Sequence, residues 1–384
     1  MRVGIVAAEA SGDLLAAGLM AALRERHPAI RFEGVGGPRM LAQGMDSWEP
    51  IESLSVMGLV EVLRHLPRLL KLRKGLRQRW LASPPDIFIG VDAPDFNLVL
   101  ETKLRESGIP TVHYVCPSVW AWREGRVKGI RAAADLLLSI LPFEKDFLAR
   151  HQVPSRYVGH TLAAELPMQV DRAGARAHFG LNERQPVLAL LPGSRVSEVS
   201  RLSRPFLQAA LTCQEQLPGL QVLVPLANQK TAAVWRDQRQ GYAPDLPVIE
   251  SLHDTRRVLA AADVVLVASG TATFEGLLSK RPMVVGYKLN ALSYWLMRLF
   301  RLVKLTHFSM ANLLSREPMA PEFIQRQCEP ERLAPAIMRF FRDAEAVQAI
   351  QTEYARVHQA LVTDTDARAA EAVLGLLRER GVIG

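Results

Sequence analysis

The sequence predicts an α/β protein with two Rossmann-like domains, in which helices cover parallel sheets. Short apolar runs of strand length alternate along the chain with longer segments of helical periodicity. This alternation begins near the N-terminus and begins again after a stretch rich in proline and charge, near residues 160 to 185. The length of 384 residues, with 49% hydrophobic and 22% charged side chains, suits two domains better than one.

The apolar runs place the strands of each domain. In the first half we expect strands at residues 3–8, 86–91, 111–116, 135–141 and 156–158, with helices such as 14–26 and 96–107 between them. In the second half we expect strands at residues 187–191, 221–225, 246–249, 263–267 and 282–286. From Pro330 onward the chain is predicted to be helical, because no glycine lies between Gln327 and Leu374. The expected domains are 1–165 and 166–345, followed by helices over 346–384 that cross back to the first domain or to a partner subunit.

Cysteine usage and hydropathy limit the class of protein. Cys116, Cys213 and Cys328 are widely separated and form no metal-binding pattern, which favours a reducing compartment. The N-terminal apolar stretch ends at Glu9, too early for the core of a signal peptide, and no window has the roughly 18 apolar residues of a membrane span. We therefore expect a protein that is neither secreted nor membrane-spanning.

Two turns between a strand and a helix predict anion binding. The apolar run at 263–267 ends in Ser269, Gly270 and Thr271, which open a helix and offer N–H groups at its positive end. The run at 187–191 ends in Gly193, Ser194 and Arg195, where the guanidinium adds a fork that matches phosphate oxygens. Each turn taken alone is equally consistent with an ordinary helix cap and a solvated arginine. Two such turns together suggest one diphosphate, and neither matches a P-loop or the G-x-G-x-x-G pattern of dinucleotide-binding enzymes.

Carboxylates follow two strands of the first half. Asp92 and Asp95 come directly after the strand at 86–91, and Glu9 follows the first strand. The carboxyl ends of parallel strands line the ligand crevice, so Asp92 or Asp95 could act as a general base. Asp95 could equally cap the next helix, and Ser11 or Asp13 could cap the first one. The paired tryptophans in segment 117–123 could stack on a sugar or pack in the core, and spacing does not separate these readings.

The net charge of +8 is concentrated in residues 64–80, which contain seven basic residues and no acid. Apolar residues recur there at near-helical spacing, and Pro67 could start a second helix. The segment therefore predicts contact with an anionic membrane surface, although its apolar stripe could instead pack on the core. Segment 280–316, with Tyr294, Trp295 and Phe300, is a second candidate. Nucleic acid is disfavoured because no recognised binding module is present. The predicted membrane contacts are Arg68, Leu69, Leu70, Lys71, Arg73, Lys74 and Leu76.

Taken together, these segments resemble the lipid A disaccharide synthases, inverting glycosyltransferases of GT-B architecture, in which a cleft separates two Rossmann-like domains. The similarity covers nearly the whole chain. Met310-Ala311, Ala8 and Cys116 depart from the family pattern, and none of them removes a catalytic group. The resemblance rests on Glu9-Ala-Ser-Gly-Asp13, Gly36-Gly-Pro-Arg-Met40, Val56-Met-Gly-Leu-Val-Glu-Val62, Asp92-Ala-Pro-Asp-Phe-Asn97, Pro117-Ser-Val-Trp-Ala-Trp-Arg123, Leu141-Pro-Phe-Glu144, Leu191-Pro-Gly-Ser-Arg195, Ser269-Gly-Thr-Ala-Thr273 and Pro282-Met-Val-Val-Gly-Tyr287.

The resemblance implies transfer of 2,3-diacylglucosamine from UDP-2,3-diacylglucosamine to 2,3-diacylglucosamine 1-phosphate. The product is a β-1,6 disaccharide, made at the cytoplasmic face of the inner membrane of a Gram-negative bacterium. Asp92 is favoured as base over Asp95, and no metal or cofactor is expected. A homodimer is left open. The implied UDP-sugar contacts are Gly193, Ser194, Arg195, Ser269, Gly270, Thr271, Glu275 at the ribose, and Asn312.

Two other functions are compatible with the same residues. The chain could be another UDP-sugar enzyme of this architecture, such as a 2-epimerase or an N-acetylglucosaminyl transferase, which would have no need for basic amphipathic segments. It could also be a protein that binds a nucleotide sugar or a lipid without catalysis, in which case the carboxylates are structural. Release of UDP in the presence of both acylated sugars separates catalysis from binding alone.

Overall fold

The computed structural model describes residues 1–54, 59–122, 124–288 and 307–383. The chain divides into two compact units: Met1–Ala164 together with Val362–Gly384, and Glu165–Leu361. Each unit is a parallel sheet with helices, as the α/β prediction requires. Near the end of the chain, α17 (Ala344–Leu361) belongs to the second unit and α18 (Thr365–Glu379) to the first.

The first unit contains a seven-stranded sheet in the order β3-β2-β1-β4-β5-β6-β7, with every described pair parallel. Its strands are β1 Arg2–Ala7, β2 Arg31–Gly36, β3 Asp46–Pro50, β4 Ile87–Val91, β5 Thr111–Tyr114, β6 Leu136–Ser139 and β7 Ser155–Tyr157. Its helices are α1 Ala10–Arg26, α2 Pro38–Ala42, α3 Leu59–Ala82, α4 Pro94–Arg105, α5 Val119–Trp122, α6 Val127–Ala133, α7 Glu144–Arg150 and α18, and α8 Thr161–Glu165 leads into the second unit. Pro67 lies inside α3 and does not start a second helix.

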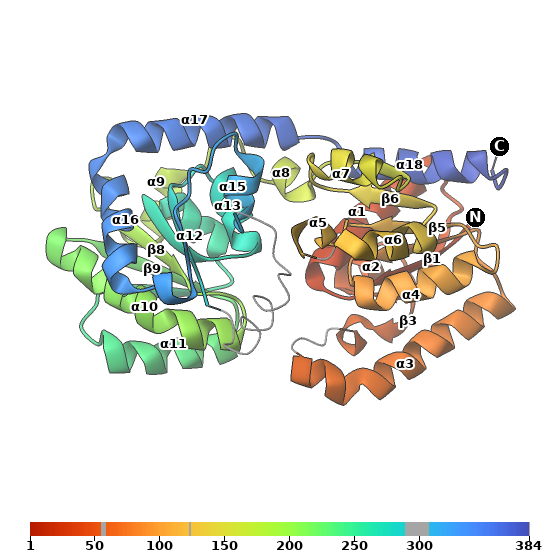
Figure 1. Ribbon diagram of the computed structural model, residues 1–384, viewed down its shortest axis with the longest axis horizontal. Coiled ribbons are helices and arrows are strands. Elements are labelled where there is room, and N and C mark those ends of the chain that lie inside the picture. Colours follow the sequence, from red (N-terminus) through yellow and green to blue (C-terminus); the bar gives the residue numbers. More distant parts are fainter. Residues whose placement is uncertain (55–58, 123, 289–306, 384) are drawn as a thin grey trace. The chain divides into compact units, whose positions relative to one another are not determined.

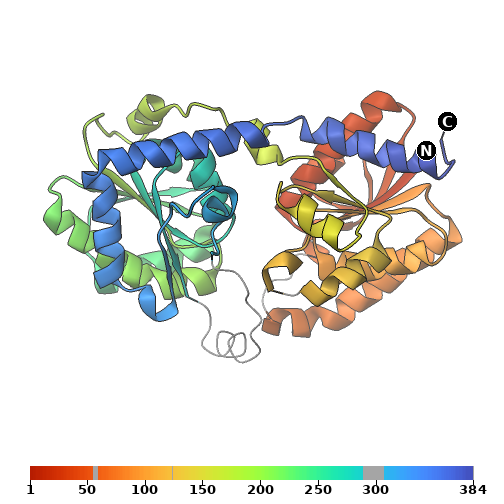
Figure 2. The ribbon, with the colours of Figure 1, turned by 45° about the horizontal axis from the view of Figure 1, so that its top comes forward.

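Both faces of this sheet are buried, because successive strand residues point to opposite sides. One face packs Val3 and Ile5 with residues of α1 and α18. The other packs Val6 and Phe88 with Trp80 of α3 and with α4. Figures 1 and 2 show α18, in blue, beside α1, in red. The end of the chain therefore completes the core formed by its beginning.

The second unit contains a six-stranded parallel sheet in the order β10-β9-β8-β11-β12-β13. Its strands are β8 Val187–Leu191, β9 Gln221–Leu226, β10 Val248–Leu252, β11 Val264–Ala268, β12 Met283–Tyr287 and β13 Glu322–Ile324. Its helices are α9 Arg172–His178, α10 Val196–Gln216, α11 Gln229–Tyr242, α12 Thr255–Ala261, α13 Thr271–Leu278, α15 Met310–Leu314, α16 Pro330–Arg342 and α17. α10 and α11 pack side by side, in green in Figure 1.

The strand orders bring the predicted site segments together within each unit. In the second unit β8 pairs with β11, with Leu191 opposite Val267, so the two glycine-containing turns leave neighbouring strands. In the first unit β1 pairs with β4, with Ala7 opposite Val91, so Glu9 and Asp92 also follow neighbouring strand ends. None of the helices in the described part of the chain combines the length and the hydropathy that a membrane-spanning helix needs.

Candidate active site

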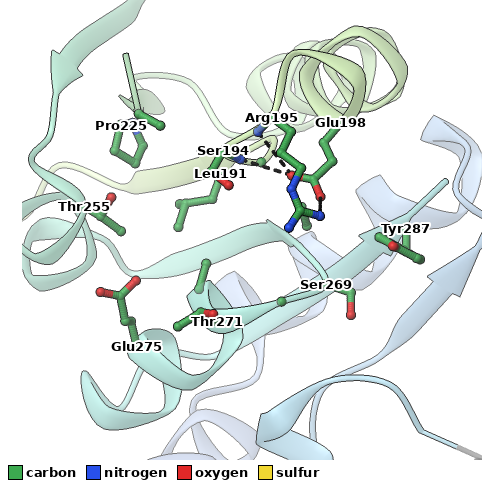
Figure 3. A pocket seen from close by; sticks show the side chains of 15 residues that line it. Leu191, Ser194, Arg195, Glu198, Pro225, Thr255, Ser269, Thr271, Glu275 and Tyr287 are labelled. Atoms are coloured by element: carbon green, nitrogen blue, oxygen red, sulfur yellow. Dashed lines mark hydrogen bonds and ion pairs between the residues drawn. The ribbon is translucent and has the colours of Figure 1, made fainter. Parts of the chain in front are cut away.

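A pocket of about 310 Å³ lies at the carboxyl ends of β8 and β11 in the second unit (Figure 3). Seven of the eight residues predicted to bind a UDP-sugar line it: six come from two turns that are far apart in the sequence, and the seventh, Glu275, lies in α13. The structure therefore brings the two predicted anion sites into one cavity. Its lining is Leu191, Gly193, Ser194, Arg195, Glu198, Pro225, Ala227, Thr255, Ala268, Ser269, Gly270, Thr271, Ala272, Glu275 and Tyr287.

The turn before α10 already holds an acidic group. The Glu198 carboxylate accepts hydrogen bonds from the backbone N–H groups of Ser194, at 3.2 Å, and Arg195, at 3.4 Å. The Arg195 guanidinium lies 3.5 Å from the same carboxylate, and its side chain is 58% exposed. Gly193, at φ +119°, leaves room for this arrangement, since a Cβ there would lie 2.6 Å from Glu198. In Figure 3 Arg195 and Glu198 lie side by side on the wall of the pocket.

The turn before α13 provides a helix N-terminus, with Gly270 at the N-cap. The Ser269 hydroxyl donates to the carbonyl of Phe308 at 3.3 Å. The Thr273 side chain is buried, donates to the Gly270 carbonyl at 2.8 Å and accepts from the Met310 N–H. Glu275 follows Thr271 by one helical turn and faces the pocket, and burial raises the pKa of its carboxyl.

Asn312, the eighth predicted residue, is absent from the pocket lining and only 5% exposed. Its amide nitrogen donates to Ala320 O at 2.7 Å and to Glu322 at 2.8 Å. Its amide oxygen accepts from the N–H groups of Met319 and Ala320, each at 2.9 Å. These four bonds use the amide's two donors and both lone pairs of its oxygen, so the side chain holds its own loop.

Four residues that line the pocket were not predicted from the sequence. They are Glu198, which binds the N–H groups of the turn before α10, and Pro225, Thr255 and Tyr287. Pro225 and Tyr287 stand at the carboxyl ends of β9 and β12, and Thr255 begins α12. All three therefore flank the same edge of the sheet, and the strand order is the signal that could have found them.

In the first unit Asp92 and Asp95 have different surroundings. Asp92 has φ +53° and Ala93 has φ +43°, a left-handed conformation that non-glycine residues seldom adopt. The Asp92 N–H donates to Tyr114 O, at the end of β5, at 2.8 Å. The Asp95 side chain is 85% exposed and pairs with Arg126. Strained backbone at a strand end is typical of functional sites, which favours Asp92 over Asp95.

The segment after β1 also differs from expectation. Glu9 is the N-cap residue of α1 but makes no side-chain cap bond, and neither Ser11 nor Asp13 caps that helix. The buried Asp13 carboxylate instead accepts from the N–H groups of Gly37, Arg39 and Met40, at 2.9, 3.0 and 3.1 Å, at the start of α2. Asp13 therefore ties the turn after β1 to the turn after β2.

Trp120, the first of the paired tryptophans, packs beside a buried acidic residue. The indole N–H of Trp120 donates to Glu144 at 3.3 Å, and its ring meets Phe143 edge to face, with centroids 4.8 Å apart. Burial raises the pKa of the Glu144 carboxyl to about 7, although the Leu141 N–H, at 3.1 Å, favours its charged form. Arg123 and the side chain of Trp122 lie outside the described residues. Trp120 is therefore held by packing and by a buried acid.

The predicted membrane segment in α3 needs correction. Leu76 is 2% exposed and packs in the core, and Leu69 is partly buried against the same cluster. Arg73 lies over the Phe96 ring at 5.9 Å and donates to Asp95 O at 3.3 Å. These residues face the body of the unit because the apolar stripe of the helix packs on the sheet. Residues 294, 295 and 300 lie outside the described part of the chain. The exposed members of the prediction are Arg68, Leu70, Lys71 and Lys74, with Leu66 beside them.

Over the described parts of the chain, no group of three or more histidine, cysteine, aspartate or glutamate residues is arranged to hold a metal ion. The three cysteines are buried and reduced. The polar groups that line the pocket of the second unit are thus those of its two glycine-containing turns, with Glu198, Thr255, Glu275 and Tyr287. In the first unit, Glu9 and Asp92 follow the ends of neighbouring strands.

Solved structures of low sequence identity share this fold. CalG4, the calicheamicin glycosyltransferase, matches over 99% of this chain and 98% of its own, with a TM-score of 0.58 and 16% identity. MnaA of S. aureus, solved with UDP, matches over 100% of this chain and 97% of its own, with a TM-score of 0.64 and 12% identity. A putative UDP-N-acetylglucosamine 2-epimerase from Listeria monocytogenes matches with a TM-score of 0.60 and 12% identity, over 99% and 96%. The predicted GT-B architecture of two Rossmann-like domains is confirmed.

Comparison at the level of sequence is more specific. Residues 3–374 match the family model of lipid-A-disaccharide synthetases. The lipid-A-disaccharide synthase of Xanthomonas euvesicatoria pv. vesicatoria is 50% identical over 382 residues, 99% of this chain and 87% of that protein. The enzyme of the same name from Pectobacterium carotovorum subsp. carotovorum is 46% identical over 99% of each chain. The chain therefore belongs to the lipid-A-disaccharide synthase family and is a UDP-sugar glycosyltransferase, and none of the comparisons favours the epimerase or the binding-protein alternative.

Proposed function

We propose that this chain binds UDP-2,3-diacylglucosamine with the UDP in the pocket of the second unit, and transfers the sugar to 2,3-diacylglucosamine 1-phosphate. The main support for a donor site here is that two glycine-containing turns, which both precede helices, line the same cavity. The solved MnaA, which has the same fold, was obtained with UDP. Glu275, one helical turn beyond the second turn, would take the ribose hydroxyls.

In this proposal the diphosphate accepts hydrogen bonds from the N–H groups of Ser194 and Arg195 and from those at the start of α13. In the structure the Glu198 carboxylate already accepts hydrogen bonds from the N–H groups of Ser194 and Arg195. A diphosphate that binds these two N–H groups must therefore displace the carboxylate. The exposed Arg195 guanidinium then supports the leaving UDP with a charge-assisted contact. These groups supply the positive charge that a metal ion would otherwise provide.

Asp92 is the proposed general base. It takes the proton of the acceptor's 6-hydroxyl while that oxygen forms a bond to the anomeric carbon. The bond from the anomeric carbon to the UDP oxygen breaks in the same step, and its electron pair leaves with UDP, so the configuration inverts. Asp95 is less suited to this role because its carboxylate faces solvent and pairs with Arg126. Glu9, at the neighbouring strand end, is proposed to lie near the acceptor.

We further propose that the exposed face of α3 rests on the anionic cytoplasmic surface of the inner membrane, where an acylated acceptor would be held. Beside this face a groove of about 800 Å³ is lined by Trp48, Arg68, Lys71 and Arg79, among others. Arg79 lies 4.5 Å above the Trp48 ring. Basic side chains beside apolar surface are the combination that anionic lipid surfaces attract.

The proposed reaction is tested by incubating the purified chain with both acylated sugars and measuring UDP and disaccharide by mass spectrometry. Equal amounts of UDP and a β-1,6 disaccharide 1-phosphate are expected. UDP release without disaccharide would contradict the proposed acceptor, and absence of both products would contradict the proposed reaction. Omitting the acceptor is the control for hydrolysis of the donor.

A further inference from the structure

Asn97 occupies an unusual place in the first unit. It lies in the first turns of α4 but is fully buried, although asparagine is a poor residue for a helix interior. It closes the Asp92-Ala-Pro-Asp-Phe-Asn97 segment, and the proposed reaction leaves it without a role. Its surroundings explain its presence.

The Asn97 amide nitrogen faces three main-chain carbonyls. It lies 2.9 Å from Asp92 O, 3.3 Å from Val91 O and 3.4 Å from Val6 O. The amide has two N–H groups for three carbonyl acceptors, so one N–H group is shared between two carbonyls. The orientation of the amide is determined by this environment, since its oxygen would meet three carbonyl oxygens if the group were turned over.

Two of these carbonyls belong to neighbouring strands, and the third belongs to the residue that follows one of them. Val6 lies in β1, which leads to Glu9, whereas Val91 ends β4 and is followed by Asp92. Gly90 makes the close approach of α4 possible, because a Cβ at this position would lie 2.9 Å from the Asn97 Cβ and 2.1 Å from Glu101 Oε1. The Asn97 side chain thus joins the carboxyl ends of the two strands that carry the proposed catalytic carboxylates.

The turn that Asn97 holds is strained. Asp92 and Ala93 both have positive φ, and Pro94 follows them, which further restricts Ala93. Conformations of this kind are unfavourable for non-glycine residues and persist only where surrounding contacts enforce them. The Asp92 main chain has two such contacts: its N–H donates to Tyr114 O at 2.8 Å, and its carbonyl accepts from Asn97.

We propose that Asn97 is a positioning residue for the transfer reaction: it fixes the left-handed turn at Asp92 and the spacing of Asp92 from Glu9. This inference rests on the proposed role of Asp92. Asn97 does not touch substrate. It acts through the carbonyls of both strands, and its loss lets the Asp92 turn relax while the donor pocket of the second unit is unaffected.

The test compares Asn97→Ala with Leu104→Ala, a buried residue near the end of the same helix whose apolar side chain cannot donate a hydrogen bond to the Asp92 turn. We expect Asn97→Ala to lower kcat at least about tenfold with the donor KM within about twofold, because small misplacements of a reacting group have effects of this size. Leu104→Ala should lower the melting temperature and keep kcat within about twofold per folded molecule. Asn97→Ser, measured in the same way, replaces Asn97→Ala if the latter does not fold.

Each result has a definite meaning. If folded Asn97→Ala or Asn97→Ser keeps kcat within about twofold, or if Leu104→Ala loses as much kcat as Asn97→Ala, the positioning role is overturned. Asp92→Asn, assayed in parallel, separates this failure from that of the proposed function. An inactive Asp92→Asn with an active Asn97→Ala rejects only the positioning role, whereas an active Asp92→Asn rejects Asp92 as the base.

Discussion

The two units have sheets of the same central order but present different chemistry at the strand ends. In the second unit, the turns after β8 and β11 contain glycine and offer N–H groups and a guanidinium to a cavity. In the first unit, the turns after β1 and β4 carry carboxylates, and the Asp92 turn has positive φ without glycine. The same strand order thus presents N–H donors in one unit and carboxylates in the other, according to a few residues after each strand.

The largest expected effect concerns the carboxylate turn. Asp92→Asn should lower kcat by about 100-fold or more, because general-base catalysis contributes on the order of 10² to 10⁴ in rate. Asp95→Asn is the matched control, and its effect should be small because its carboxylate is exposed. Steady-state assays of both variants measure this. A larger loss for Asp95→Asn would exchange the two roles.

The second prediction concerns the exposed basic face of α3. Reversing Arg68, Lys71 and Lys74 to glutamate should lower binding to anionic vesicles on the order of 100-fold, since each basic residue near such a surface contributes about 1 kcal/mol. The control reverses three exposed bases elsewhere in the first unit, Lys128, Arg131 and Lys145. Vesicle sedimentation measures the difference. Equal effects of the two triple variants would show that net charge, and not α3, directs binding.

The third prediction uses the buried Glu144. Its folded pKa of about 7 lies above the ordinary value near 4.5, so the folded state holds the proton more tightly. The free energy of unfolding should therefore fall as pH rises between these two values, by up to about 3 kcal/mol from this group. Denaturant titrations at pH 5 and pH 8 should show this fall in the wild type and a smaller one in Glu144→Gln. Asp146→Asn, on the exposed side of the same helix, should behave as wild type, and an unchanged pH dependence in Glu144→Gln would contradict the assignment.

The smallest expected effect concerns Glu198, next to the turn before α10. Glu198→Gln keeps an acceptor for the N–H groups of Ser194 and Arg195 but removes a charge that competes with the diphosphate. UDP should therefore bind a few times more tightly, an effect of about 1 kcal/mol or less for a partly exposed charge. Titration calorimetry with UDP measures it. Weaker binding in Glu198→Gln would mean that the carboxylate supports the bound state.

Much of the fold and of the donor pocket could be predicted from the sequence because their signals are local. An apolar run followed by glycine, serine or threonine predicts both a strand and the turn that leads from it into a helix, as at 187–195 and 263–271. β2 and β3 were missed because Arg31, Glu33 and Asp46 interrupt any apolar period, and β13 is too short to show one. These strands are stabilised by the neighbours that the topology gives them.

Side-chain partners were the part that sequence could not supply. Asp13 lies where a helix cap is expected but binds the N-terminus of α2, and Asn312 lies near the pocket in sequence but holds its own loop. Leu76 has the periodicity of a membrane-facing residue and is in the core. In each case the residue type limits the chemistry, while the choice of partner depends on chain segments that are distant in sequence.

The central claim is that the second unit binds the nucleotide and the first supplies the base. It is tested most directly by measuring the UDP dissociation constant and kcat for Asp92→Asn and Arg195→Ala. Asp92→Asn should lower kcat about 100-fold or more with UDP binding within about twofold, whereas Arg195→Ala should weaken UDP binding about tenfold or more through loss of a charge-assisted contact. If Asp92→Asn weakens UDP binding as much as Arg195→Ala does, or if Arg195→Ala leaves UDP binding unchanged, this division of roles is contradicted.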